Sequence, residues 1–263
     1  MKHKILLWLL SIAVLFPLSG VYAQSFPSFE KHTLIKNQDT LPYRLLLPQN
    51  YDPHKKYPLV IFLHGSGERG NDNEKQLTHG AALFLKDENR AAFPAIVVFP
   101  QCSQRSFWSN VKITGAGKDR SFEFTAGGAP TFPMQLVMEL TKELFDKYSV
   151  QRKKVYVIGL SMGGMGTFEL VNRMPRTFAA AIPICGGASA ATAPNLKKVK
   201  WWVFHGAKDD VVPPKYSEEM VAAMKKSKVN VKFTLFPDAN HNSWDATFAQ
   251  PGLLNWLFSQ QRK

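Results

Sequence analysis

Short apolar runs that alternate with helix-like segments restrict the fold of this chain more than any other feature of its sequence. The runs lie at residues 58–63, 95–99, 155–158, 180–184, 201–204 and 231–236. Each is nearly continuous in apolar residues, as expected of strands that are buried on both faces of a sheet. Strands of this kind that alternate with helices predict an α/β architecture, a mostly parallel twisted sheet with helices on both faces.

Helix-like patterns fill the intervals between the runs, and residues 43–47 indicate an additional N-terminal antiparallel strand. The patterns predict helices at residues 133–144, 166–172, 217–226 and 253–258. Residues 101–130 are the exception, because they are rich in Gly, Ser and Lys and show no periodicity. A segment of that length without periodicity is usually functional or mobile. Sheets of this class bind ligands at the carboxyl ends of their strands, so residues directly after each strand are candidates for chemistry.

The first 23 residues have the composition of a secretory signal peptide. Lys2 and Lys4 supply a positive start, residues 5–18 form an apolar run, and Val21 and Ala23 stand at positions −3 and −1 of a cleavage site. The apolar run is shorter than the roughly 20 residues that a transmembrane helix needs. We therefore expect export to the periplasm or the medium, cleavage before Gln24, and no stable membrane insertion.

The chain is basic, with a formal net charge of +13, and loss of Lys2 and Lys4 leaves +11. Such a charge favours contact with anionic surfaces or acidic polymers. No helix-turn-helix, zinc-finger or RNA-binding signature accompanies it, so nucleic acid is not an expected partner. We interpret the excess of positive charge as a solvated basic face.

The sequence Gly159-Leu160-Ser161-Met162-Gly163 follows one of the predicted strands directly. A G-x-S-x-G pattern between a strand and a helix is typical of a nucleophilic serine on a sharp, strained turn. Side chains two residues before and after the serine would collide with neighbouring backbone, which explains glycine at both places. We predict that Ser161 is a nucleophile.

A serine hydroxyl needs a base to take its proton and an acid to orient that base, here expected in the order Ser, Asp or Glu, His. Asp209 follows the strand at 201–204, and His241 follows the strand at 231–236. Asp209 lies four residues before Pro213, the usual place for the acid, so we favour it over its neighbour Asp210. Asp238 is an alternative that is expected only to shape the loop before His241.

The remaining polar groups of interest lie in glycine-rich loops. Stabilisation of an oxyanion needs two backbone N–H donors, and one is expected from Met162, the residue after the nucleophile. The other is expected from the loop after the strand at 58–63, from Ser66 or, as second choice, from Gly67. His64 and His205 each precede a glycine after a strand, and we interpret both as buried groups that shape their loops.

Together these motifs resemble the α/β-hydrolase superfamily over residues 40–258, nearly the whole mature chain. The closer resemblance is to bacterial proteins described as predicted peptidases, akin to carboxylesterase/phospholipase and feruloyl-esterase-like enzymes. It is carried by residues 43–48, 57–65, 67–70, 159–164 and 241–244. The resemblance implies one α/β-hydrolase catalytic domain over residues 24–263, the triad Ser161, Asp209 and His241, and neither metal nor organic cofactor.

The resemblance also bears on Cys102 and Cys185, the only cysteines. Two cysteines in an exported chain would suggest a disulfide. In this fold the strands that precede them are expected three positions apart, about 14 Å at roughly 4.8 Å per strand, which is too far for a disulfide. We therefore predict two free and mostly buried thiols.

The substrate is less constrained than the reaction. Phe107, Trp108 and Trp244 lie in loops at the predicted active-site end, and aromatic faces suit sugar rings or aryl groups. With Gly67 and Arg69, Trp108 and Trp244 are the candidate substrate-binding residues. Feruloyl or acetyl esters on plant polysaccharide are the favoured substrates.

Three alternatives remain open: a general short-chain carboxylesterase or lipase, a peptidase or acyltransferase, and a binding module that has lost catalysis on a hydrolase scaffold. The sequence does not indicate an oligomeric state, nor whether residues 101–130 form a lid.

Overall fold

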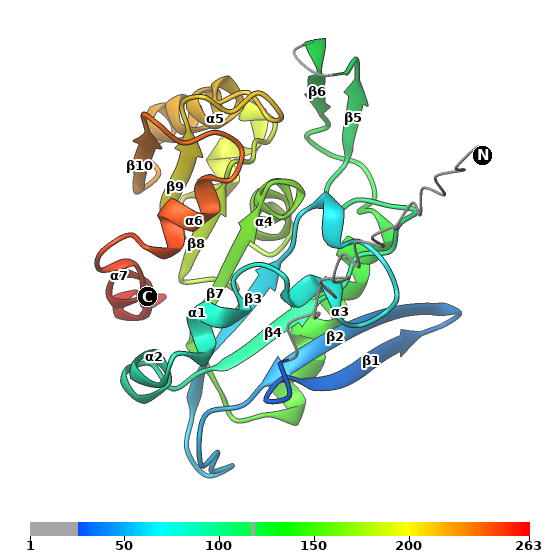
Figure 1. Cartoon of the computed structure of the whole chain (residues 1–263), viewed down its shortest axis with the longest axis vertical. Helices are drawn as coiled ribbons and strands as arrows, with labels where there is room; N and C mark the ends of the chain where they lie inside the picture. The colour runs from blue at the N-terminus through cyan, green and yellow to red at the C-terminus, as the bar shows by residue number, and fades with distance from the viewer. Residues whose placement is uncertain (1–25, 117–118) are drawn as a thin grey trace, which may run out of the picture.

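Within residues 26–116 and 119–263, which the computed structural model describes, eight strands form one sheet in the order β1-β2-β4-β3-β7-β8-β9-β10 (Figure 1). The predicted signal peptide, residues 1–23, lies outside the described residues. The strands are β1 (Glu30–Lys36), β2 (Asp39–Leu46), β3 (Tyr57–Leu63), β4 (Ile96–Pro100), β7 (Val150–Leu160), β8 (Ala180–Ile184), β9 (Lys200–Gly206) and β10 (Val231–Phe236).

Strands β4, β3, β7, β8, β9 and β10 pair in parallel, whereas β1 and β2 add an antiparallel pair at one edge. The six apolar runs and the strand predicted at 43–47 are confirmed. The sequence did not indicate β1, because only Leu34 of its residues is buried and the rest of the strand is polar or exposed. A strand with one buried residue has no periodicity strong enough to detect.

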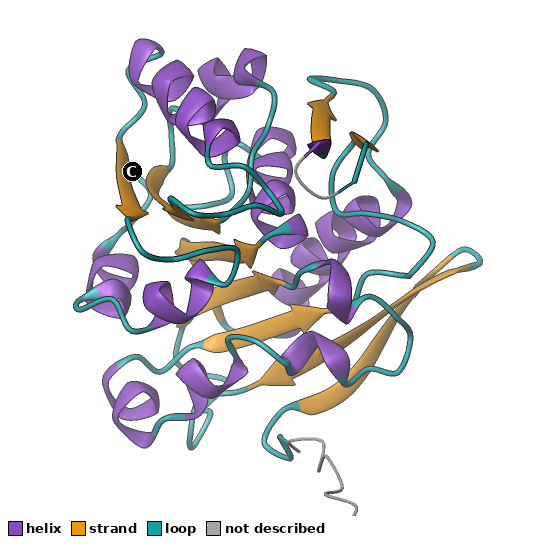
Figure 2. Ribbon diagram, turned by 45° about the horizontal axis from the view of Figure 1, so that its top comes forward, coloured by secondary structure: helices purple, strands orange, loops and turns teal. Residues whose placement is uncertain are grey.

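Helices cover both faces of the sheet (Figure 2). One apolar cluster joins the sheet to α3 (Phe132–Lys147), α4 (Met162–Arg173) and α5 (Lys215–Lys226). The other joins it to α1 (Ala81–Leu85), α6 (Ser243–Phe248) and α7 (Leu253–Ser259), and the short α2 (Asp87–Ala92) lies beside α1. Strand β3 shows the pattern: Leu59 and Ile61 enter the first cluster, and Val60 and Phe62 enter the second. The expected doubly covered sheet is confirmed.

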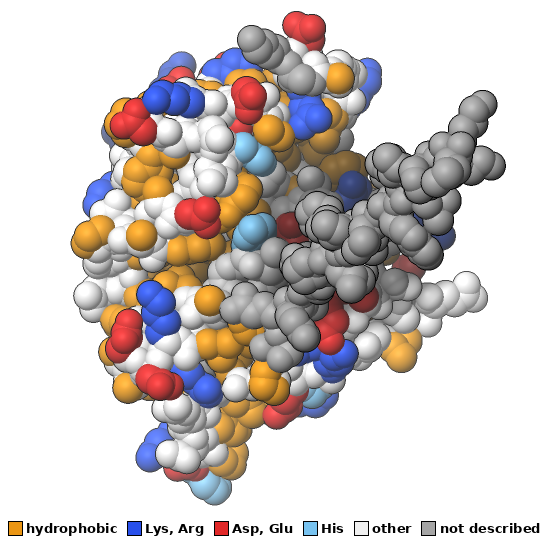
Figure 3. Space-filling model, in the orientation of Figure 1, with side chains coloured by type: hydrophobic (Ala, Val, Ile, Leu, Met, Phe, Trp, Pro, Cys, Tyr) orange, Lys and Arg blue, Asp and Glu red, His pale blue; other side chains and the backbone are white. Residues whose placement is uncertain are grey.

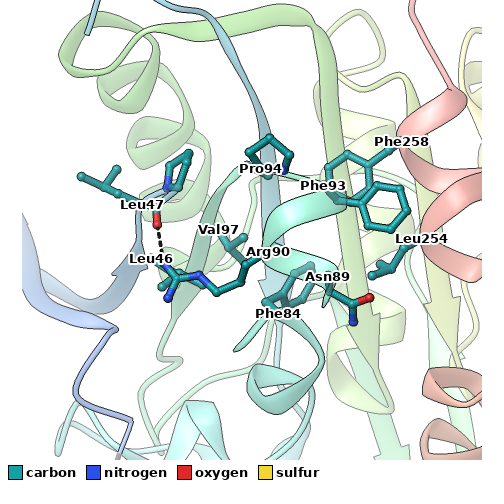
Figure 4. A pocket seen from close by; sticks show the side chains of 12 residues that line it. Leu46, Leu47, Phe84, Asn89, Arg90, Phe93, Pro94, Val97, Leu254 and Phe258 are labelled. Atoms are coloured by element: carbon teal, nitrogen blue, oxygen red, sulfur yellow. Dashed lines mark hydrogen bonds between the residues drawn. The ribbon is translucent and has the colours of Figure 1, made fainter. Parts of the chain in front are cut away.

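One cavity lies at the end of the sheet where the parallel strands begin. A small cavity of about 20 Å³ lies at the amino end of β4, between α2 and α7, where Arg90 donates a hydrogen bond to the carbonyl of Leu47 (Figure 4). Its walls are largely apolar, with Phe93 and Phe258 among them. A volume of about 20 Å³ holds about one water molecule. The cavity at the amino end of β4 is therefore a packing defect and not a binding site.

Residues 101–130 contain a structure that the sequence did not reveal. Strands β5 (Val111–Thr114) and β6 (Ser121–Phe124) pair as a separate antiparallel hairpin. The hairpin buries Phe122 against Tyr216 of α5, whose hydroxyl accepts the Phe122 N–H at 2.9 Å. Most of its other side chains are exposed, which explains the missing periodicity.

A second correction concerns α4, which begins at Met162 and not at Gly166 as the sequence predicted. Glycine has a low helix propensity, so the glycines at 163 and 164 argued against a helix there. Their role is close packing, because a Cβ on Gly163 would overlap the carbonyl oxygen of Leu63 and a Cβ on Gly164 would overlap that of Ile184. Packing outweighs propensity at this position.

On the face of the molecule shown in Figure 3, Lys and Arg side chains alternate with Asp and Glu side chains. The basic residues of this face are not gathered into one patch. In the part of the chain that the structure describes, no helix has both the length and the apolar character required to cross a bilayer.

Cys102 and Cys185 are both free and both buried, as predicted. They follow β4 and β8, and β3 and β7 lie between these two strands in the sheet. The expected separation of three strand positions is confirmed.

Candidate active site

Ser161 connects the end of β7 to the start of α4 in a strained backbone conformation, with φ of 54° and ψ of −118°. A non-glycine residue in this region costs on the order of 1–3 kcal/mol, which the surroundings must supply. The N–H of Ser161 donates to the carbonyl of Ile184 at 2.8 Å, and this bond ties the turn to β8. The predicted strained strand-to-helix turn is confirmed.

The flanking glycines are required by close packing. A Cβ on Gly159 would overlap the carbonyl oxygen of Gly163, and a Cβ on Gly163 would overlap the carbonyl oxygen of Leu63 at the end of β3. Gly166 is similarly crowded, because its Cβ would come within 2.5 Å of the Cβ of Trp108. The turn that carries Ser161 is therefore pressed directly onto the end of β3.

Ser161, His241 and Asp209 form one chain of hydrogen bonds. The Ser161 hydroxyl lies 3.0 Å from Nε2 of His241, and Nδ1 of His241 lies 2.8 Å from Oδ2 of Asp209. Asp209 is buried, and the His241 side chain is only 19% exposed. His241 can therefore take the serine proton on one nitrogen while the carboxylate fixes the other nitrogen as a donor.

The carboxylate of Asp209 is held in its ionised form. Its Oδ1 accepts the N–H groups of Val211 and Val212, each at 2.9 Å. Burial by itself acts to raise the pKa of Asp209. Hydrogen bonds from His205, His241 and the Val212 N–H, with the charge of His241, outweigh burial and hold this pKa well below its usual range.

The two competing acids lie elsewhere. Asp210 is exposed, and Asp238 is paired at the surface with Lys208 at 2.8 Å. Of the three candidates, only Asp209 reaches His241.

His205 makes a contact that the sequence did not reveal. The ring is fully buried, as expected of a loop-shaping residue, but its Nε2 lies 3.2 Å from Oδ2 of Asp209 and 2.8 Å from the carbonyl of Val212. Two acceptors at Nε2 assign the proton to that nitrogen. Nδ1 lies 2.7 Å from the hydroxyl of Ser217. One sequence feature could have predicted this contact: His205 and Asp209 are four residues apart, on either side of one tight turn.

The loop after β3 lies against Ser161. A Cβ on Gly65 would come within 3.7 Å of the Ser161 Cβ, and Ser66 begins the short 3₁₀ turn Ser66–Glu68. The first N–H groups of a helix have no partner inside it, and this applies to Ser66 here and to Met162 at the start of α4. Both predicted oxyanion donors are thus backbone N–H groups at the starts of turns near the serine.

His64 fixes the backbone of this loop. Its Nδ1 donates to the carbonyl of Gly65 at 2.6 Å, and its Nε2 accepts the N–H of Cys102 at 2.9 Å. Burial lowers the pKa of His64 to about 4, so the ring is neutral at pH 7, which this pattern of one donor and one acceptor requires. The predicted loop-shaping role is supported by these contacts.

Glu68 folds back over the same loop. Its Oε2 occupies the space beside Gly65, 2.9 Å from where a Cβ would lie. Oε1 of Glu68 lies 3.9 Å from His79, and burial raises the pKa of Glu68. His64 therefore holds the carbonyl of Gly65, and the Glu68 carboxylate fills the space on the side where a larger residue would carry its Cβ.

Trp108 is a correction to the predicted substrate-binding residues. Its ring is fully buried, packs edge-on against His64, and donates from Nε1 to the His64 carbonyl at 3.1 Å. A ring with no exposed surface cannot stack on a substrate, so Trp108 supports the loop from below.

Arg69 connects the loop after β3 to the loop after β4. Its guanidinium donates to the carbonyls of Ser66, Gln104 and Ser106 and lies 4.6 Å from the centre of the Phe107 ring. Gly67 is exposed, and a Cβ there would meet no atom within 4 Å. Open space beside Gly67 is consistent with its predicted contact to substrate, whereas the contacts of Arg69 are structural.

Trp244 lies next to the candidate base. Its ring is partly buried and meets His241 edge-to-face at 5.4 Å between centroids. On its other side it meets His79 at 5.0 Å. Trp244 is thus close enough to the triad to contact a bound substrate.

Cys185, Asp209 and His241 bring potential metal-ligand atoms within 4.8 Å of one another. The atoms of Asp209 and His241 that face each other already share the hydrogen bond of the triad, and burial raises the pKa of the Cys185 thiol far above neutrality. A thiol binds metal as thiolate, so this group fits proton transfer better than metal ligation.

The arrangement has the parts needed for acyl transfer. A serine hydroxyl is bonded to a histidine, the histidine is oriented by a buried carboxylate, and two backbone N–H groups lie near the serine. Asp209 and His241 follow β9 and β10, and Ser161 follows β7, so all three meet at the carboxyl edge of the sheet.

Comparison with known proteins gives a consistent result. A family model described as "Putative esterase" matches residues 37–249. The chain is 24% identical over 207 residues to "Probable feruloyl esterase C" of Aspergillus oryzae, covering 77% of this chain and 69% of that protein. It is 29% identical over 170 residues to "Bifunctional acetylxylan esterase/xylanase XynS20E" of Neocallimastix patriciarum, covering 63% of this chain and 21% of that protein.

A solved structure described as "Crystal Structure of a Thermostable Esterase" is similar over 90% of this chain, with a TM-score of 0.81 and 34% identity. The match covers 64% of that protein, so this chain corresponds to less than two thirds of its length.

Proposed function

The chain belongs to this esterase family, within the α/β-hydrolase superfamily, and we propose that it is an exported serine esterase that works through an acyl-enzyme on Ser161. That it is a carboxylic ester hydrolase follows from the family. The proposal adds the residues, the intermediate and the location. The observation that carries it is the unbroken hydrogen-bond chain from the Ser161 hydroxyl through His241 to Asp209.

In the proposed mechanism, Ser161 attacks the ester carbonyl while His241 takes its proton. The N–H groups of Met162 and Ser66 stabilise the oxyanion that forms. His241 then gives its proton to the departing alcohol, which leaves the acyl group on Ser161. Water, deprotonated by His241, attacks the acyl-enzyme and releases the acid. Asp209 orients His241 and stabilises its protonated form throughout.

We further propose that the substrates are feruloyl or acetyl esters of plant polysaccharide. The names of two relatives, a feruloyl esterase and an acetylxylan esterase, support this substrate class. Trp244 beside the triad and Phe107 under Arg69 offer aromatic surface for an aryl group or a sugar ring. A general short-chain carboxylesterase is the second candidate, because the same triad serves it equally well.

Labelling with a fluorophosphonate probe tests the nucleophile. The wild-type protein should react once, at Ser161, and Ser161→Ala should not react. Loss of the triad acid should lower kcat on p-nitrophenyl butyrate by a factor of about 10³ or more, because the histidine then loses its orientation. The matched pair Asp209→Asn and Asp210→Asn separates the adjacent acids, and only the first should show this loss. A chain that binds esters without reacting at Ser161 would instead be a binding module.

Rates on methyl ferulate, acetylated xylan and p-nitrophenyl butyrate test the substrate. Activity on either of the first two supports esters of plant polysaccharide. Turnover of p-nitrophenyl butyrate alone supports the general carboxylesterase. Export is tested separately by the mass of the protein recovered outside the cytoplasm, which should begin at Gln24.

A further inference from the structure

We propose that a polar groove beside the active site binds the sugar chain of an esterified polysaccharide, away from the sugar that carries the ester. This inference rests on the proposed substrate class. The groove has a volume of about 450 Å³ and is walled by residues from 38–42, from 70–75 and from 101–105, with Phe132 at the start of α3. We refer to it as the β2 groove.

The β2 groove opens at the same edge of the sheet as Ser161. Strand β2 runs antiparallel to β4, and Tyr43 pairs with Pro100, the last residue of β4. Residues 39–42 therefore lie beyond the carboxyl end of β4. Strand β3 alone separates β4 from β7, which leads to Ser161, so the two strand ends are about 10 Å apart. A polymer held at Ser161 could reach the groove within a few sugar units.

Hydrogen bonds join the β2 groove to the loop beside the nucleophile. Gln101, in the groove wall, donates from Nε2 to the carbonyl of Glu68 at 3.2 Å. Arg69 donates to the carbonyl of Gln104, also in the wall, at 3.1 Å. A chain that occupies the groove would therefore lie against the same loop that faces the ester carbonyl.

Hydrogen bonds within the wall hold its side chains in place. Gln101 is fully buried, and its Oε1 accepts the N–H of Asn73 at 2.7 Å while its Nε2 also donates to Asp72 at 2.9 Å. Hydrogen bonds from Lys75, Gln101 and Glu74 outweigh the effect of burial and lower the pKa of Asp72 to about 2. A wall that is already ordered loses little conformational freedom on binding, which favours affinity.

The chemistry of the wall matches a neutral, hydroxyl-rich chain. Asp39 and Asp72 offset Lys75 and Arg105, so the groove carries no net charge to favour an anion or a cation. The remaining polar side chains include amides that both donate and accept, which pair well with sugar hydroxyls. Phe132, partly exposed, adds an aromatic ring of the kind that stacks on sugars.

A second groove provides a control. It is larger, about 740 Å³, and is lined by residues that include Lys56 and Asn255. Its walls include Tyr57 and Pro58 at the start of β3, so it lies at the amino edge of the sheet, opposite to Ser161. A polymer with its ester at Ser161 would have to pass around the molecule to reach it.

The test compares two double variants of the purified protein. Asn71→Ala with Arg105→Ala removes exposed polar side chains from the β2 groove, and Lys56→Ala with Asn255→Ala makes a matched change in the other groove. For acetylated xylohexaose, KM should rise about tenfold in the first variant and stay unchanged in the second. For p-nitrophenyl acetate, which is too short to reach the groove, kcat and KM should stay unchanged in both.

Binding of unesterified xylohexaose, measured by calorimetry, separates this inference from the proposed function. The wild-type protein should bind it, and the β2-groove variant should bind it about tenfold more weakly. Cleavage of acetylated xylohexaose with the same KM in all three proteins would contradict sugar binding in the β2 groove. The proposed function would not be affected by that result. Binding without cleavage would support the groove and count against the substrate class. Absence of binding together with an unchanged KM would also overturn the groove.

Discussion

His205 and His241 contact the same carboxylate oxygen, Oδ2 of Asp209, at 3.2 and 2.8 Å. His241 makes this contact from the carboxyl end of β10 and His205 from within the end of β9. Two donors on one oxygen divide its negative charge between them. Cys185, also close to Asp209, adds no charge near neutrality because burial keeps its thiol protonated. The hydrogen bond from His205 is therefore one of the contacts that hold the pKa of Asp209 low.

The first prediction concerns this shared oxygen. In His205→Ala, Asp209 loses a hydrogen bond that lowers its pKa, so this pKa should rise and the acid limb of kcat/KM should move to higher pH. His205→Gln, whose amide can still donate to the carboxylate, should restore most of the wild-type profile. A pH–rate profile from pH 5 to 9 on p-nitrophenyl butyrate measures the shift. An unchanged limb in His205→Ala would show that His205 only fills space.

The second prediction concerns Glu68, whose carboxylate packs beside Gly65 in the loop that carries Ser66. Glu68→Ala should lower kcat about tenfold with little change in KM, because the loop loses this packing and the proposed oxyanion donor becomes less ordered. Glu68→Gln keeps the shape of the side chain and should recover most of kcat. Glu219→Ala, an exposed change on α5, is the control. A rise in KM at constant kcat would point to substrate binding by Glu68 instead.

The third prediction concerns stability and pH. The pKa of His64 is about 4 in the folded protein and about 6.5 in an unfolded chain. Below pH 6.5 the unfolded state binds a proton that the folded state does not, so the free energy of unfolding should fall as pH falls from 6.5 toward 4. The loss attributable to His64 should be about 2 kcal/mol between pH 6.5 and 5.

Urea denaturation at several pH values measures this loss. His64→Gln should show a shallower dependence on pH across the same window. His54→Gln, at an exposed histidine, should behave as the wild type. Equal slopes in all three proteins would contradict a neutral, buried His64.

The fourth prediction concerns the two thiols. Burial raises the pKa of Cys102 to about 12 and that of Cys185 further, so neither is ionised to a useful extent at pH 8. Iodoacetamide at pH 8 should leave the folded protein unmodified. In denaturant without reductant it should add two groups, detected by mass spectrometry. Adducts on the folded protein would show that a thiol is accessible, and none after denaturation would indicate a disulfide.

The sequence predicted the sheet and the grouping of Ser161, Asp209 and His241 because both depend on features that are local in the chain. Each buried strand is a short apolar run, and each candidate catalytic residue follows such a run directly. Knowledge that parallel strands end at one edge is then enough to bring Ser161, Asp209 and His241 together. The constraint on glycine at 159 and 163 is also local, because it follows from the sharpness of a single turn.

The features that the sequence did not predict depend on contacts between distant segments. Trp108 looks like a loop aromatic until the packing of its ring on Gly166 and His64 is known. The β5–β6 hairpin buries little apolar surface of its own. It is held in place by contacts with Tyr216, which lies about 90 residues later in the chain. His205 was predicted to be buried, but its bond to Asp209 depends on how one turn folds back.

The close contact between Gly163 and the end of β3 has a consequence for variation of this enzyme. Because no atom can be inserted there, the turn that carries Ser161 and the end of β3 must shift together or not at all. Engineering of selectivity should therefore leave the glycines at 159 and 163 unchanged.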